Sequence, residues 1–81
     1  MNVHLHFFSR LRELTGIAEM DLQVQPTTNV AALLEILYSR TSALREWDQS
    51  ILVAAGVEFV DRDYVLQEDD QISIMPPLQG G

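Results

Sequence analysis

The residues best suited to chemistry stand at the end of the sequence, which reads PPLQGG over residues 76–81. A diglycine has no side chain to obstruct a narrow channel, and its backbone can adopt any allowed turn. The two prolines fix φ and remove two backbone donors, so sheet pairing stops there and the exit direction is stiff. An ordinary frayed terminus has no need of this combination. We therefore predict a flexible tail that can enter a partner's active site, with a reach from Met75 of up to roughly 20 Å.

Two other groups of side chains could bind a cation. His4 and His6 lie two apart on an alternating segment, which puts both imidazoles on one face of a strand. Because no third ligand lies nearby in the sequence, we interpret them as solvated histidines. The acidic runs over residues 61–63 and 68–70 lack the regular ligand spacing of a calcium loop, and we interpret them as solvated turns. No metal or cofactor site is predicted.

The composition describes one small, acidic domain. The chain has 81 residues, 47% of them hydrophobic, which suits a single core and excludes a two-domain enzyme with a cleft between its lobes. Twelve acidic side chains stand against five basic ones, all arginine, for a formal net charge of −7. Nucleic acids and anionic membrane surfaces both need clustered positive charge on a protein, so neither is expected as a partner. The charge favours a partner with a basic docking face.

The expected cellular location follows from what the sequence lacks. It has no cysteine, which excludes a disulfide framework, a thiolate metal site and a thiol nucleophile. The first residues lack the basic start and apolar run of a signal peptide, and no stretch approaches the ~20 apolar residues that span a bilayer. We expect a soluble, cytoplasmic protein.

Five segments have the pattern of β-strands. Residues 3–8 and 20–25 alternate apolar and polar side chains, as half-buried strands do. Residues 51–55 are continuously apolar, which is typical of a strand that is covered on both faces or lies at the centre of a sheet. A glycine turn leads to a short strand over 57–60, and residues 72–75 alternate again before the prolines.

Two segments have the pattern of helices. Residues 9–16 predict a short helix with Ser9 as its N-cap and Gly16 as its stop. Residues 27–29 are cap residues for the main helix over 30–40. In that helix apolar side chains recur at i, i+3, i+4 and i+7, which forms one apolar stripe.

The element order is strand, short helix, strand, main helix and three further strands. One main helix against a mixed five-stranded sheet makes the fold α+β, and a single long crossover through that helix is typical of the β-grasp arrangement. Residues 41–50, including Trp47, lose the helical pattern and are interpreted as a connection that covers one end of the core. We predict a β-grasp domain over residues 1–75 and the tail over 76–81.

Two segments of the sequence resemble one family in particular. A β-grasp body that ends in two glycines is similar to the ubiquitin-like sulfur carriers. Within that group, the ending over residues 76–81 resembles the PP-x-x-GG ending of the MoaD family, the small subunits of molybdopterin synthase. The segment FFSRLRELTG over residues 7–16 resembles the FF-x-x-x-RE-x-x-G segment of the same family. The resemblance extends over essentially the whole chain.

The resemblance implies that the chain is a sulfur carrier. An activating enzyme would adenylate the Gly81 carboxylate with ATP, and a sulfurtransferase or persulfide donor would then convert it to a thiocarboxylate. Gly80 and Gly81 would enter the large synthase subunit, where two such transfers build the dithiolene of molybdopterin from cyclic pyranopterin monophosphate. The chain would bind no cofactor and supply no catalytic side chain, and it would join the large subunit in a two-plus-two heterotetramer.

A docking surface is expected beside the tail. Phe8 and Met75 point outward on neighbouring strands if the first and last strands pair, as the β-grasp requires, unless the short helix covers Phe8. The resemblance adds Phe59 to this apolar patch and suggests Arg12 as an ion-pair partner for the activating enzyme. The other residues expected to contact a partner follow on the tail and are Pro76, Pro77, Leu78 and Gln79.

Two positions depart from the family pattern. Met75 stands where the family often has phenylalanine, which softens the specificity expected of docking. Residues 68–70 read Glu-Asp-Asp where the family usually has Asp-Gly-Asp. Aspartate tolerates unusual φ better than most residues, so we expect the turn to persist.

Other functions remain open at this point. The chain could carry sulfur for thiamine biosynthesis or tRNA thiolation, modify other proteins through an isopeptide bond at Gly81, or serve as a plain interaction module. The sequence contains no lysine, which argues against chains built on this protein itself because no side-chain amine could accept another copy. Attachment to other proteins stays open.

Overall fold

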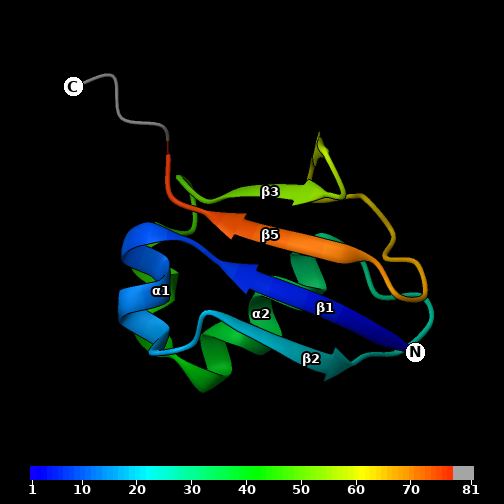
Figure 1. Ribbon diagram of the computed structural model, residues 1–81, viewed down its shortest axis with the longest axis horizontal. Coiled ribbons are helices and arrows are strands. Elements are labelled where there is room, and N and C mark those ends of the chain that lie inside the picture. Colours follow the sequence, from blue (N-terminus) through cyan, green and yellow to red (C-terminus); the bar gives the residue numbers. More distant parts are fainter. Residues whose placement is uncertain (78–81) are drawn as a thin grey trace.

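The computed structural model describes residues 1–77. Within this range the chain forms five strands, two α-helices and one 3₁₀ helix (Figure 1). In chain order they are β1 (Asn2–Phe7), α1 (Ser9–Thr15), β2 (Glu19–Gln23), α2 (Val30–Arg40), the 3₁₀ helix η1 (Ser42–Trp47), β3 (Leu52–Ala55), β4 (Glu58–Val60) and β5 (Gln71–Met75). None of the helices in residues 1–77 is long and apolar enough to cross a membrane.

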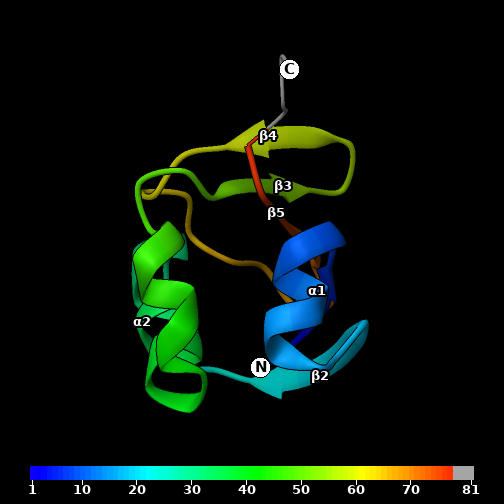
Figure 2. The same ribbon diagram turned by 90° about the vertical axis from the view of Figure 1, so that its left-hand side faces the viewer.

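The strands form one mixed sheet in the order β2-β1-β5-β3-β4. The first and last strands, β1 and β5, pair in parallel, and the other neighbours are antiparallel. α2 lies behind the sheet in Figure 1, and α1 follows the end of β1, as the turned view in Figure 2 also shows. The α+β class, the five strands and the pairing of the first and last strands confirm the predicted β-grasp topology.

The core lies between the sheet and α2. The alternation predicted for β1 is confirmed, because Val3, Leu5 and Phe7 are at most 3% exposed while the residues between them are half-buried. The apolar stripe predicted for the main helix is also confirmed. The buried residues of α2 are Val30, Leu33, Leu34, Leu37 and Tyr38.

The ends of the helices follow the prediction at two points and differ at one. Gly16 ends α1 in the left-handed conformation with φ at 73°, and the Asn29 side chain caps α2 by accepting the Ala32 backbone N–H at 2.9 Å. The prediction that Ser9 is the N-cap of α1 is wrong, because Phe8 takes that position in an extended conformation. The Phe8 N–H pairs with β5 while its carbonyl oxygen already accepts the N–H groups of Leu11 and Arg12, so α1 begins one residue earlier than predicted, at Ser9.

Residues 41–50 also differ from the prediction. Instead of an irregular connection, they contain η1, which packs the side chain of Leu44 into the core at 1% exposure. A 3₁₀ helix is too short and too tightly wound to show the apolar period of 3.6 residues by which α-helices are predicted. The acidic turn behaves as expected, since Asp69 adopts the positive φ of 64° that a glycine often supplies.

Candidate functional site

The predicted docking residues meet where β1 and β5 end and α1 begins. The backbone N–H of Phe8 donates to the carbonyl oxygen of Ile74 at 3.1 Å, and Met75 is the last residue of β5. Phe8 and Met75 therefore lie at neighbouring strand ends, as predicted. Phe8 remains 43% exposed, so α1 does not cover it.

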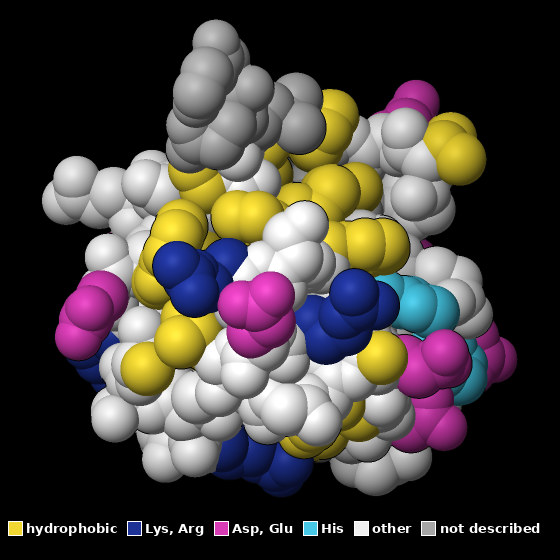
Figure 3. Space-filling view, turned by 60° about the vertical axis from the view of Figure 1, so that its left-hand side comes forward, with side chains coloured by type: hydrophobic (Ala, Val, Ile, Leu, Met, Phe, Trp, Pro, Cys, Tyr) yellow, Lys and Arg dark blue, Asp and Glu magenta, His cyan; other side chains and the backbone are white. Residues whose placement is uncertain are grey.

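Phe8 and Met75 line an apolar groove with a volume of about 450 Å³. The other residues that line it are Ser9, Arg10, Trp47, Pro76 and Pro77. Hydrophobic side chains gather together on one face of the molecule in Figure 3, with basic and acidic side chains beside them. The structure thus brings four of the predicted docking residues into one site, two from the domain and the two prolines.

Phe59 lies on the same outward face of the sheet but does not line the groove. It pairs with Ala54 across β3 and β4. Leu52, two residues before Ala54, pairs with Met75 across β3 and β5. Side chains two apart on a strand share a face, so Phe59 points to the same side of the sheet as Met75. At 63% exposure, its ring is largely available to a partner.

Arg12 lies one helical turn beyond Phe8. Its backbone N–H donates to the carbonyl oxygen of Phe8 at 3.3 Å, and its side chain is exposed. Arg12 forms no ion pair with another residue of the described range 1–77, whereas Arg10 at the groove lies 3.4 Å from Glu13. An exposed pair of this kind contributes little to stability. α1 therefore presents two exposed arginines in a chain of net charge −7, and one of them, Arg10, lines the groove.

The last predicted site residues, Leu78, Gln79, Gly80 and Gly81, lie outside the described residues. Pro76 and Pro77 are the last residues that the structure describes, and both are half-buried. Because both prolines line the groove, the described part of the chain ends at the apolar site.

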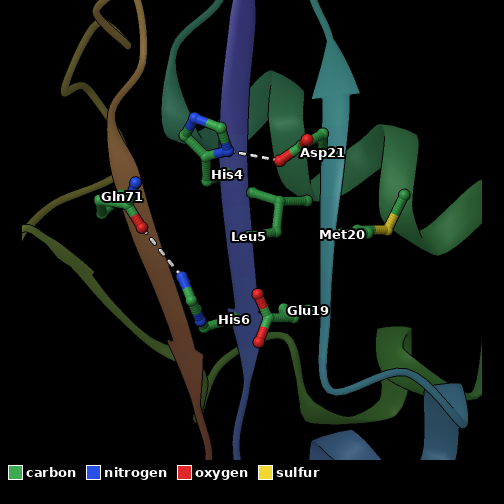
Figure 4. Close-up of a pocket in the computed structure, with 7 residues that line it drawn as sticks. All are labelled: His4, Leu5, His6, Glu19, Met20, Asp21 and Gln71. Carbon is green, nitrogen blue, oxygen red and sulfur yellow. Dashed lines mark hydrogen bonds and ion pairs between the residues drawn. The ribbon is translucent and has the colours of Figure 1, made fainter.

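The two histidines line a different hollow on the open face of the sheet (Figure 4). His4 Nδ1 contacts the Asp21 carboxylate and its Nε2 lies 3.6 Å from Asp69, while His6 Nε2 is 2.9 Å from the Gln71 side-chain oxygen. The hydrogen bond with Asp21 raises the pKa of His4 above its ordinary value of 6.5. Residues 1–77 contain no group of three or more histidine, aspartate or glutamate side chains arranged to hold a metal ion. The contacts of His4 instead connect β1 to Asp21 on β2 and to Asp69 in the turn before β5.

Sequence reasoning did not place three of the groove residues in the site. Ser9 and Arg10 reach the groove because α1 begins directly after Phe8. Trp47 reaches it because η1 carries the chain back toward α1, and the sequence pattern predicted no helix there. The signal available in the sequence was a large aromatic residue in a segment without periodicity, which we interpreted only as a cover for the core.

Comparison with known proteins identifies a family and a similar curated protein. The ThiS family matches residues 5–81. The protein named molybdopterin synthase sulfur carrier subunit of Drosophila erecta is 36% identical over 84 residues, which cover 100% of this chain and 92% of that protein.

Two solved structures share the fold. The putative molybdopterin converting factor subunit 1 of Pyrococcus furiosus has a TM-score of 0.85 at 24% identity, with 95% of this chain and 98% of that chain covered. The protein–protein complex of subunits 1 and 2 of the molybdopterin-converting factor of Helicobacter pylori contains a chain with a TM-score of 0.71 at 24% identity, and both chains are covered completely.

Proposed function

The chain belongs to the ThiS family, and we propose that it is the sulfur carrier subunit of a molybdopterin synthase. The observation that carries this proposal is the 36% identity, over the whole chain, to the sulfur carrier subunit of Drosophila erecta. The apolar groove supports it, because Pro76 and Pro77 line that groove and a carrier must dock beside the point where its tail enters a partner.

In the proposed reaction the Gly81 carboxylate is activated before it receives sulfur. A carboxylate oxygen is a poor leaving group, so an activating enzyme first adenylates the carboxylate with ATP. The terminal sulfur of a persulfide on a sulfurtransferase or other donor then attacks the acyl adenylate and displaces AMP. A second thiol cleaves the resulting acyl disulfide, forms a disulfide with the donor sulfur, and releases the thiocarboxylate on Gly81. The thiocarboxylate is a good nucleophile at neutral pH.

Sulfur transfer takes place in the large subunit of the synthase. That subunit holds cyclic pyranopterin monophosphate and supplies the acid and base groups, while this chain acts as a co-substrate without catalytic side chains. Two carrier turnovers provide the two sulfurs of the dithiolene, and the two kinds of subunit assemble as a two-plus-two heterotetramer. The solved complex of subunits 1 and 2 from Helicobacter pylori supports a pairing of this kind.

The outward apolar residues dock the carrier on its partners. Phe8 and Met75 pack at the mouth of the channel, and Phe59 extends the contact along the sheet. Pro76 and Pro77 set the exit direction, and Leu78 and Gln79 lead to the diglycine. Arg12 pairs with a carboxylate of the activating enzyme.

Reconstitution from purified components tests the proposal. The chain, an activating enzyme, ATP and a sulfur source are combined with the large subunit and cyclic pyranopterin monophosphate, and molybdopterin is measured. We expect product with the full chain and none after deletion of Gly80 and Gly81, because the reacting carboxylate then falls short of the chemistry. Addition of one residue beyond Gly81 should also abolish product, since the acceptor carboxylate is then moved.

The controls keep folding separate from function. The truncated chain should keep the unfolding temperature of the full chain, because its deletion lies beyond β5. Molybdopterin formed by the truncated chain contradicts the proposal. Sulfur accepted by the full chain without any molybdopterin points to a carrier for another thiolation pathway.

A further inference from the structure

Trp47 occupies a place in the groove that the proposed function does not yet use. It is the single tryptophan of the chain and the last residue of η1. Its side chain is half-buried and lines the groove with Phe8, Met75 and the two prolines. The groove is thus lined on one side by η1 and on the other by the ends of β1 and β5.

The backbone around Trp47 is held in place from both sides. Its carbonyl oxygen accepts the backbone N–H groups of Ser50 at 2.8 Å and Ile51 at 3.0 Å. Three residues earlier, the buried side chain of Leu44 anchors η1 in the core. The indole is therefore presented from a fixed segment and needs little ordering when a partner binds.

A polar cluster fixes the next residue along the chain. The Asp48 carboxylate accepts the Tyr38 hydroxyl at 2.5 Å and the Arg62 Nη1 group at 3.2 Å. Arg62 also donates to the Asp48 backbone carbonyl. These bonds join η1 to α2 and to the loop after β4, and they lower the pKa of the Asp48 carboxyl, with the Tyr38 hydrogen bond as the largest cause.

We propose that Trp47 is a docking residue for the large subunit, and that an apolar side chain beside the partner's channel mouth packs between Trp47 and Phe8. This inference rests on the proposed function. Pro76 and Pro77 line the same groove, so a partner that takes up the chain beyond Pro77 has to lie over it. Because the lining is apolar apart from Ser9 and Arg10, the occupant it fits is an apolar side chain.

Fluorine NMR on the full chain tests this assignment directly. With 5-fluorotryptophan incorporated, the single tryptophan gives one resonance that reports on Trp47 alone. The unlabelled large subunit is titrated in, and its affinity is measured in parallel for Trp47→Ala, Trp47→Phe and Val65→Ala. Val65 is the matched control, since it is an apolar residue at 46% exposure that bridges to Asn29 before α2 and does not line the groove.

We expect the resonance to shift in the complex and Trp47→Ala to weaken binding by about tenfold or more, with Trp47→Phe close to the original chain and Val65→Ala unchanged. The unfolding free energy of each variant is measured as a folding control. If Trp47→Ala does not fold, the fluorine resonance of the original chain still decides.

Three results would overturn the inference in distinguishable ways. If the complex forms but the fluorine resonance does not shift, and Trp47→Ala binds the large subunit as tightly as the original chain, Trp47 is not part of the interface. The proposed function is then unaffected. A resonance that moves with the chain's own concentration assigns the groove to a second copy. Absence of any complex with the large subunit refutes the proposed function, and this inference fails with it.

Discussion

Replacement of Phe59 by alanine should separate docking from folding. Phe59 lies on β4, a three-residue strand at the edge of the sheet, and its ring points outward at 63% exposure. Only the smaller part of the side chain is covered within the domain. A partner that docks on this face covers most of the remainder.

The expected size follows from the exposed area. A phenylalanine presents about 200 Å² of surface, so 63% exposure leaves about 125 Å² for a partner to cover. At about 25 cal/mol per Å², complete coverage is worth about 3 kcal/mol, which is an upper limit. Because docking covers part of this area, we expect Phe59→Ala to weaken binding by about 2 kcal/mol, or about 30-fold in Kd. The isolated domain should lose only about 1 kcal/mol.

Two measurements on the same protein samples decide the matter. Calorimetric titration with the large subunit gives the change in Kd, and urea unfolding gives the change in stability. Val65→Ala, an apolar truncation at 46% exposure that lies outside β4 and does not line the groove, should leave Kd unchanged. If Phe59→Ala lowers the free energy of unfolding by several kcal/mol while the folded protein binds the large subunit with unchanged affinity, Phe59 is a structural residue. In that case it does not belong to the docking surface.

Three further predictions concern stability, each measured by urea unfolding. The hydrogen bond with Asp21 raises the pKa of His4 in the folded chain above the ordinary value of 6.5. Protonated His4 therefore stabilises the fold fully below about pH 6.5, and this stabilisation is lost as the pH rises through the raised pKa. His4→Gln should therefore flatten this fall, and an unchanged pH profile would contradict it. Gly16→Ala should lower the free energy of unfolding by about 1 kcal/mol, because φ at this position is 73° although an added Cβ would meet no neighbouring atom. Gly16→Asn should cost less, because asparagine tolerates a left-handed backbone better. Equal stability of the original chain and both variants would refute this explanation. Tyr38→Phe should cost about 1 kcal/mol through loss of the hydrogen bond to Asp48, and a cost near zero would show that this bond does not stabilise η1.

The sheet and the main helix could be predicted because their patterns are local. The alternation through Val3, Leu5 and Phe7 and the spacing of apolar residues in α2 each follow from the geometry of one element. Gly16 could be predicted as a helix stop for the same reason, since a left-handed residue is a property of the residue itself.

The remaining features depend on contacts between distant parts of the chain. Phe8 displaces Ser9 as the N-cap because its N–H pairs with Ile74, which the local sequence does not encode. Likewise, η1 is stabilised by the buried side chain of Leu44 and by the Tyr38–Asp48–Arg62 cluster. Because these contacts leave no periodic pattern in the sequence, the helix could not be predicted from it.

The candidate site divides in the same way. The apolar residues Phe8 and Met75 could be predicted once the first and last strands were expected to pair, because their outward direction follows from alternation. The part played by Trp47 could not be predicted, since it needs the position of η1 relative to α1. The groove is thus a tertiary feature, built from three segments that lie far apart in the sequence.

The central claim, that Gly81 carries sulfur, is tested most directly by intact mass. The full chain is incubated with ATP, an activating enzyme and a sulfur source, and its mass is followed, with fragmentation to locate any change. We expect a gain of one sulfur for one oxygen on the last residue, dependent on ATP and absent from the chain without Gly80 and Gly81. A chain that keeps its original mass under conditions in which a known carrier gains sulfur, or that gains it elsewhere, contradicts the claim.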